Sequence, residues 1–157
     1  MIEQEIGGLL RKKGWTLAIA ESCTGGLVAS RITQVGGSSV YFVGAVVAYA
    51  NRIKTHVLGV DADLIDQEGA VSEIVARCMA ERTRKLFAVD VALATTGIAG
   101  PAGGTDAKPV GLVFVALASE EVVNVCRCQF EGDRKTIQRA ASDTALKMLR
   151  AYIQEQS

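Results

Sequence analysis

The sequence predicts an α/β fold, a three-layer α/β/α sandwich built on a mixed, mostly parallel sheet. Short apolar runs typical of strands alternate with segments of helical periodicity along most of the chain. Near the end, two strand-like runs flank Ser119-Glu120-Glu121, a pattern that predicts a β-hairpin and therefore some antiparallel pairing. Plentiful Ala, Val and Gly with only 5% aromatic residues favour helices packed closely on the sheet.

The first half of the chain contains two expected strands, each followed by a helix. The opening helix ends near Gly14, because glycine is the usual residue after a helix C-terminus. The expected elements are, in order, a helix over residues 2–13, a strand over 16–20, a helix beginning after Gly25-Gly26, a strand over 40–48, a short helix from Asn51 toward Leu58, and a helical turn over 61–67.

The second half begins with Ser72, which is placed as the N-cap of a helix reaching Leu86. A buried strand over 90–96 follows and ends in a glycine-rich loop over 97–104. The two hairpin strands cover 110–118 and 122–130, and Asp133 opens a long final helix. No repeat, linker or low-complexity tract divides the chain, so residues 1–157 are expected to form a single domain.

Charge and hydropathy exclude several classes of partner. The formal net charge is zero, so no long-range field would attract nucleic acid or an anionic membrane. No run approaches the roughly 20 apolar residues of a membrane span, and the N-terminus does not resemble a signal peptide. A cytoplasmic location with reduced thiols is therefore expected.

The metal-ligating residue types do not form a zinc pattern. The four cysteines include Cys126 and Cys128, which are expected on one face of a strand and do not match the Cys-x-x-Cys spacing. His56 is the only histidine and has no partners for a Ser/His/Asp arrangement. The sequence therefore predicts no metal and no cofactor.

The turn from Glu21 to Gly26 is the first candidate for chemistry. A serine between a buried strand and a glycine-initiated helix lies beside free backbone N–H groups, which can stabilise an oxyanion. Ser22 is accordingly a candidate nucleophile, although Ser22 or Thr24 could equally cap the helix. Glu21 could orient a neighbouring group or cap the turn.

Lys54 is the second candidate. If Asn51 is the N-cap of its helix, Lys54 lies near the positive end of the helix dipole, which favours the neutral amine. A neutral lysine is the form that accepts a hydroxyl proton during attack. The alternative is an exposed lysine without a chemical role.

Two further segments are suited to binding a phosphate or ribose. The loop from Thr95 to Gly104 is glycine-rich but matches neither the P-loop nor the dinucleotide fingerprint, so it could be only a turn. Arg134 lies in the first turn of the last helix, a position suited to phosphate, although a surface carboxylate would be an equally good partner.

These segments occur in one order that closely resembles the nicotinamide-nucleotide amidase family, the C-terminal domain of CinA-type competence/damage-inducible proteins. The resemblance extends from about residue 3 to residue 152. The segments that carry it are Ala20-Glu21-Ser22-Cys23-Thr24-Gly25-Gly26, Gly36-Gly37-Ser38-Ser39, Tyr49-x-Asn51-x-x-Lys54, Gly69-Ala70-Val71-Ser72, Gly97-Ile98-Ala99-Gly100-Pro101-x-Gly103-Gly104, Lys108-Pro109-Val110-Gly111 and Gly132-Asp133-Arg134.

The resemblance implies a metal-free Ser/Lys hydrolysis of the carboxamide of nicotinamide mononucleotide, giving nicotinic acid mononucleotide and ammonia. It also implies an α/β/α sandwich and a homodimer or larger homo-oligomer. Ser22 is implied as nucleophile and Lys54 as its base, with Tyr49 in the catalytic group. The residues implied around the substrate are Thr24, Gly25, Asn51, Thr96, Gly100, Gly104 and, on the phosphate side, Arg134.

The chain departs from the family pattern at two positions. Ala50 stands where many members have serine, and Thr96 replaces a serine while keeping a hydroxyl. The chain also lacks the additional N-terminal domain of full-length relatives, so only the amidase portion is expected. One alternative is a non-catalytic nucleotide-binding or regulatory module. A second alternative is a mechanism with Cys23 as nucleophile, because a thiol at a helix N-terminus can be acidified.

Overall fold

The computed structural model, which describes residues 1–157, contains one five-stranded sheet in the order β2-β1-β3-β4-β5. The strands are β1 (Leu17–Glu21), β2 (Phe42–Val47), β3 (Val91–Gly97), β4 (Leu112–Ala118) and β5 (Val123–Gln129). β1 pairs in parallel with β2 and β3, while β4 is antiparallel to both β3 and β5. Only β4 therefore runs against the other strands, which confirms the predicted mixed, mostly parallel sheet and the hairpin.

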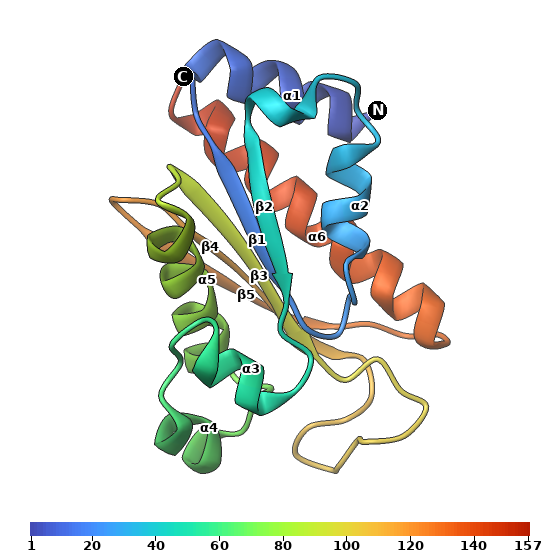
Figure 1. The fold of residues 1–157 in the computed structure, drawn as a ribbon. Helices are drawn as coiled ribbons and strands as arrows, with labels where there is room; N and C mark the ends of the chain where they lie inside the picture. The colour runs from blue at the N-terminus through green and yellow to red at the C-terminus, as the bar shows by residue number, and fades with distance from the viewer.

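Helices cover both faces of the sheet, as Figure 1 shows. One face carries α1 (Ile2–Lys13), α2 (Leu27–Thr33) and α6 (Arg134–Glu155), and the other carries α3 (Asn51–His56), α4 (Ala62–Glu68) and α5 (Glu73–Phe87). Each face has its own apolar core. The larger joins Ile6, Val28 and Ile137 to the sheet, and the smaller joins Val75 and Met79 to it. The predicted three-layer sandwich is confirmed.

The local signals located most helix ends correctly. Gly14 follows α1 in the left-handed conformation, at φ 68°. The Ser72 side chain accepts from the Val75 N–H, and the Asp133 side chain accepts from the Thr136 N–H at 2.8 Å. Because a short 3-10 turn, η1 (Ser38–Val40), comes first, β2 is shorter than the strand predicted over 40–48.

The helix α3 begins at Asn51, as predicted, but its N-cap is the residue before. Ala50 is the N-cap, and its carbonyl accepts from the N–H groups of Ile53 and Lys54. Asn51 is therefore the first helical residue, and its side chain makes no capping hydrogen bond. Lys54 is consequently the fourth residue of a six-residue helix and lies in its last turn as well, so the premise of the argument from the positive end of the dipole does not hold.

The topology gathers the candidate residues at one edge of the sheet. β1, β2 and β3 run in the same direction, and the segments that follow them contain Ser22, Tyr49 to Lys54, and Ile98 to Gly104. In open α/β sheets this carboxyl edge is where ligands bind. None of the helices combines the length and the apolar character that crossing a membrane requires.

Candidate active site

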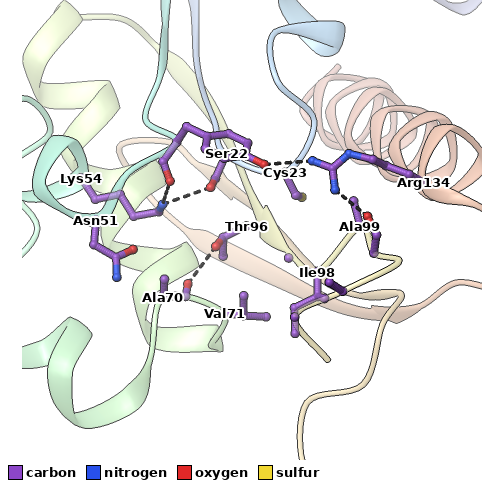
Figure 2. A pocket seen from close by; sticks show the side chains of 15 residues that line it. Ser22, Cys23, Asn51, Lys54, Ala70, Val71, Thr96, Ile98, Ala99 and Arg134 are labelled. Atoms are coloured by element: carbon purple, nitrogen blue, oxygen red, sulfur yellow. Dashed lines mark hydrogen bonds between the residues drawn. The ribbon is translucent and has the colours of Figure 1, made fainter. Parts of the chain in front are cut away.

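A cavity of about 270 Å³ opens at this edge between the loops after β1, β2 and β3 (Figure 2). Polar groups from different elements face it. They include Ser22, Asn51, Lys54, Thr96 and Arg134. Five residues predicted from separate motifs are thus brought together in one cavity.

Ser22 and Lys54 form a direct, buried pair. Lys54 Nζ lies 3.0 Å from Ser22 Oγ, within hydrogen-bond reach of the proton that a base would take. Ser22 is 8% exposed and Lys54 only 1%, although a lysine side chain is normally in solvent. The second bond of Lys54 Nζ, to the Tyr49 carbonyl oxygen at 3.1 Å, fixes the amine on its other side.

Burial lowers the pKa of Lys54 below the ordinary value for lysine, because the charged form loses its hydration. Neither of its hydrogen-bond partners carries a charge, and no salt bridge of Lys54 offsets that loss. The neutral amine is the form that a general base requires, so burial supplies what the predicted dipole effect was expected to supply.

Cys23 lines the same cavity but is a poor nucleophile. Its side chain is 5% exposed, and burial raises the pKa of its thiol to about 12. The negative charge of Glu21 raises that pKa further, while Lys54 opposes the effect. A thiol that stays protonated near neutrality is unreactive, so the geometry favours Ser22 over the alternative with Cys23.

The backbone of the turn leaves a candidate oxyanion donor. The Ser22 N–H donates to the Thr95 carbonyl, whereas the Cys23 N–H donates to no protein acceptor. The first-turn amides of α2, Val28 and Ala29, donate to the Glu21 carboxylate at 2.9 and 3.0 Å. These two amides of α2 are therefore occupied, and the free amide beside Ser22 belongs to the turn before the helix.

Arg134 closes the opposite side of the cavity (Figure 2). Its guanidinium donates to the Gly100 carbonyl at 2.6 Å and to the Tyr49 hydroxyl at 2.9 Å. No carboxylate pairs with it, so the alternative of a surface ion pair was wrong. The Tyr49 side chain is 59% exposed, and Tyr49 contacts Lys54 through its backbone carbonyl.

A further wall of the cavity is apolar, and only half of it was predicted from the sequence. Ala70 and Val71 come from the segment before α5, and Ile98 and Ala99 come from the loop after β3. Thr96 Oγ1 ties the two segments together by donating to the Ala70 carbonyl at 2.8 Å. The loop half of this wall was expected to bind substrate, whereas nothing in the motif Gly69-Ala70-Val71-Ser72 indicated that Ala70 and Val71 would contact β3.

Three of the residues predicted around the substrate do not line the cavity: Thr24, Gly25 and Gly104. Thr24 is buried behind the turn, where its hydroxyl bonds to Glu21 and Thr95. Gly25 occupies a left-handed conformation in the turn, at φ 60°. A Cβ on Gly104 would come within 2.8 Å of the Val110 nitrogen, so this glycine allows the loop to approach the chain before β4.

The side chains suited to metal binding are dispersed. No three His, Cys, Asp or Glu residues gather as a metal site. The donors in the cavity are hydroxyls, an amine, a carboxamide and a guanidinium, which suit an uncharged polar group and an anion.

The fold and the site together define an α/β/α protein with a buried serine–lysine pair at the carboxyl edge of its sheet. The sequence model of the CinA C-terminal domain matches residues 1–153. The chain therefore belongs to the CinA C-terminal domain family, which confirms the resemblance seen in the motifs.

Known relatives are named CinA-like proteins. The chain is 51% identical over 149 residues to a CinA-like protein of Geobacter sulfurreducens and 50% identical over 149 residues to one of Geotalea daltonii. Each alignment covers 95% of this chain but 36% of the relative, so the chain spans about a third of those proteins.

Solved structures share the fold. A CinA superfamily protein of Klebsiella pneumoniae superposes with a TM-score of 0.94 at 30% identity, covering 98% of this chain and 96% of that one. A competence/damage-inducible protein of Agrobacterium tumefaciens superposes with a TM-score of 0.87 at 37% identity, covering 94% of both chains.

Proposed function

We propose that the protein hydrolyses the carboxamide of nicotinamide mononucleotide, releasing ammonia and nicotinic acid mononucleotide. The observation that carries the proposal is the 3.0 Å contact between Ser22 Oγ and the buried amine of Lys54. Membership of the CinA C-terminal domain family, which is linked to this amidase activity, supports the choice of substrate. The apolar wall would receive the pyridine ring and Arg134 the phosphate.

In the first half of the reaction, Ser22 Oγ attacks the carboxamide carbon while Lys54 Nζ takes the hydroxyl proton. The carbonyl oxygen becomes an oxyanion, which the Cys23 N–H is available to stabilise. The protonated lysine then returns its proton to the leaving nitrogen. The C–N bond breaks, ammonia departs and an acyl-serine ester remains.

In the second half, water replaces ammonia as the partner of Lys54. The neutral amine takes a proton from water, hydroxide adds to the ester carbon, and Ser22 Oγ leaves with the proton held by lysine. The products are the regenerated pair and a carboxylic acid, which loses its proton to solvent and becomes the carboxylate. The bond to the Tyr49 carbonyl holds Lys54 Nζ beside Ser22 Oγ in both halves.

The proposal is tested by measuring ammonia release from nicotinamide mononucleotide, with chromatography of the nucleotide product. Stoichiometric ammonia and nicotinic acid mononucleotide are expected from the purified chain. Free nicotinamide and nicotinamide riboside, which lack the phosphate, are expected to react far more slowly. Mononucleotide binding without ammonia release would contradict the amidase and favour a non-catalytic nucleotide-binding module.

Replacing Arg134 by glutamine is expected to raise KM for the mononucleotide by about 10- to 100-fold with a smaller change in kcat. A charge-assisted hydrogen bond contributes about 1.5–3 kcal/mol, and a neutral amide keeps the reach but not the charge or the fork. Steady-state kinetics on the mononucleotide and the riboside provide the check. An equal loss on both substrates would show that Arg134 supports the loop through Gly100 rather than binding phosphate.

A further inference from the structure

Glu21 is a fully buried carboxylate directly before the nucleophile. It is the last residue of β1, paired with Val47 on one side and Thr95 on the other, and it is 0% exposed. Its side chain crosses to the next element and accepts the Val28 and Ala29 N–H groups at the start of α2. One residue thus joins the end of the strand to the beginning of the helix, with the Ser22–Gly26 turn held between them.

The hydrogen bonds around Glu21 have a single consistent direction. A carboxylate only accepts, so the Thr24 hydroxyl donates to Glu21 Oε1 at 2.6 Å. Because the Thr24 hydroxyl has given its only proton to Glu21, the Thr95 hydroxyl must be the donor in the 2.7 Å hydrogen bond to Thr24 Oγ1. Three donors therefore converge on the two oxygens of Glu21, and the side chain of Thr95 on β3 is held in the same chain of hydrogen bonds.

Glutamine, the neutral isostere of glutamate, cannot make the same hydrogen bonds at position 21. In glutamine, one of the two carboxylate oxygens becomes an NH₂ group that has only protons to offer. If it takes the place of Oε2, it faces the Ala29 N–H, and in the flipped orientation it faces the Val28 N–H. Either orientation sets donor against donor inside the protein, which leaves buried groups unpaired and displaces the turn.

We propose that Glu21 is the positioning residue of the nucleophile, holding the Ser22–Gly26 turn so that Ser22 Oγ meets Lys54 Nζ and the Cys23 amide remains open. The inference rests on the proposed Ser/Lys mechanism but not on the identity of the amide. Glu21 does not line the cavity and makes no hydrogen bond to Lys54, so it acts on the chemistry by holding the turn rather than by touching the substrate.

The test measures Ser22 directly, without a substrate. A fluorophosphonate probe reacts with activated serines, and intact-mass and peptide mass spectrometry follow its labelling of Ser22. Glu21→Gln is expected to label about 100-fold more slowly than the wild-type chain, the loss that follows a displacement of about 1 Å. In the amidase assay kcat should fall by a similar factor, while KM should change less than about twofold, because Thr96 and Arg134 stand on β3 and α6.

Glu3→Gln is the matched control. Glu3 is also a buried glutamate that holds α2, through a 2.6 Å ion pair with Arg31 near the other end of that helix. It is expected to lower the thermal midpoint while leaving the Ser22 labelling rate within about twofold. Should Glu21→Gln fail to fold, Thr24→Val replaces it, and about 10-fold slower labelling is expected from losing one of the three donors.

Different results would contradict the amidase activity and the positioning role of Glu21. Fast labelling of wild-type Ser22 with no ammonia release would end the amidase proposal and leave the role of Glu21 standing. Labelling at the wild-type rate in Glu21→Gln, or in Thr24→Val where that variant is needed, would overturn the inference, as would a wild-type Ser22 that the probe does not label. Equal slowing in Glu3→Gln would also overturn it, because the effect would then reflect general loosening of α2.

Discussion

Replacing Ser22 by alanine is expected to abolish catalysed ammonia release, with kcat falling by about 10⁶-fold, the loss typical of a hydrolase without its nucleophile. The variant should fold normally, because the Ser22 hydroxyl makes a single hydrogen bond, to Lys54 Nζ. Losing one such bond changes the free energy of unfolding by about 1 kcal/mol. Ammonia release and thermal unfolding, measured on the same preparation, separate the two effects.

The matched control is Ser38→Ala. Ser38 is 9% exposed, close to the value for Ser22, but it lies in η1 away from the cavity. Its removal should leave kcat unchanged. Cys23→Ala tests the neighbouring thiol, whose pKa of about 12 keeps it protonated, and this variant should retain most activity. An active Ser22→Ala protein together with an inactive Cys23→Ala protein would show that the nucleophile is the Cys23 thiol.

The sheet was predictable because its signals are local. Apolar runs, the Ser119–Glu121 turn, and the caps at Ser72 and Asp133 each depend on neighbours a few residues away. The edge at which the site would form followed from the parallel strands, since ligands bind at their carboxyl ends. Those same signals placed Ser22, Lys54, Thr96 and Arg134 at strand or helix ends, which is where the cavity lies.

The remaining features depend on contacts between distant segments. The prediction of Asn51 as N-cap followed the side-chain preference for asparagine, yet the structure uses Ala50. Lys54 then reaches Ser22, 32 residues away, and a local preference carries no information about that contact. Glu21 was predicted either to orient a neighbouring group or to cap the turn, and its partners Val28 and Ala29, seven and eight residues further along the chain, could not be identified from the sequence.

The apolar wall of the cavity also depends on a contact between distant segments. Ala70 and Val71 precede α5 in the chain and have no motif of their own for ligand binding. They face the cavity because the Thr96 hydroxyl on β3 draws the Ala70 carbonyl toward it. A tertiary hydrogen bond between residues 26 apart therefore adds Ala70 and Val71 to a binding surface that only the β3 segment indicated.

Replacing Lys54 by methionine is expected to remove activity almost completely while raising stability. A positioned general base contributes about 10²–10⁴-fold to the rate, and Lys54 serves both halves of the proposed reaction, so a loss near the upper end of this range is expected. Methionine has a similar length and no charge to bury. Replacing a buried ionisable group by a well-packed apolar one is commonly neutral or stabilising.

The stability gained in Lys54→Met is expected to depend on pH. The pKa of Lys54 is lowered in the folded protein, so between that pKa and the ordinary lysine value the unfolded chain binds more protons than the folded one. Wild-type stability attributable to Lys54 therefore increases as pH rises through this window and is lowest below it. The stabilising effect of Lys54→Met should be largest below the folded-state pKa of Lys54 and should shrink as pH rises toward the ordinary lysine value.

Activity should follow the same ionisation. The rate with wild-type protein is expected to rise with pH as Lys54 loses its proton, with a midpoint below the ordinary lysine pKa, because burial disfavours the charged amine. Denaturant unfolding of Lys54→Met at several pH values, with kcat/KM profiles of the wild-type protein, tests both. A variant that is less stable at every pH, beside a flat wild-type profile, would mean that Lys54 is a structural donor to Tyr49 and Ser22 rather than the base.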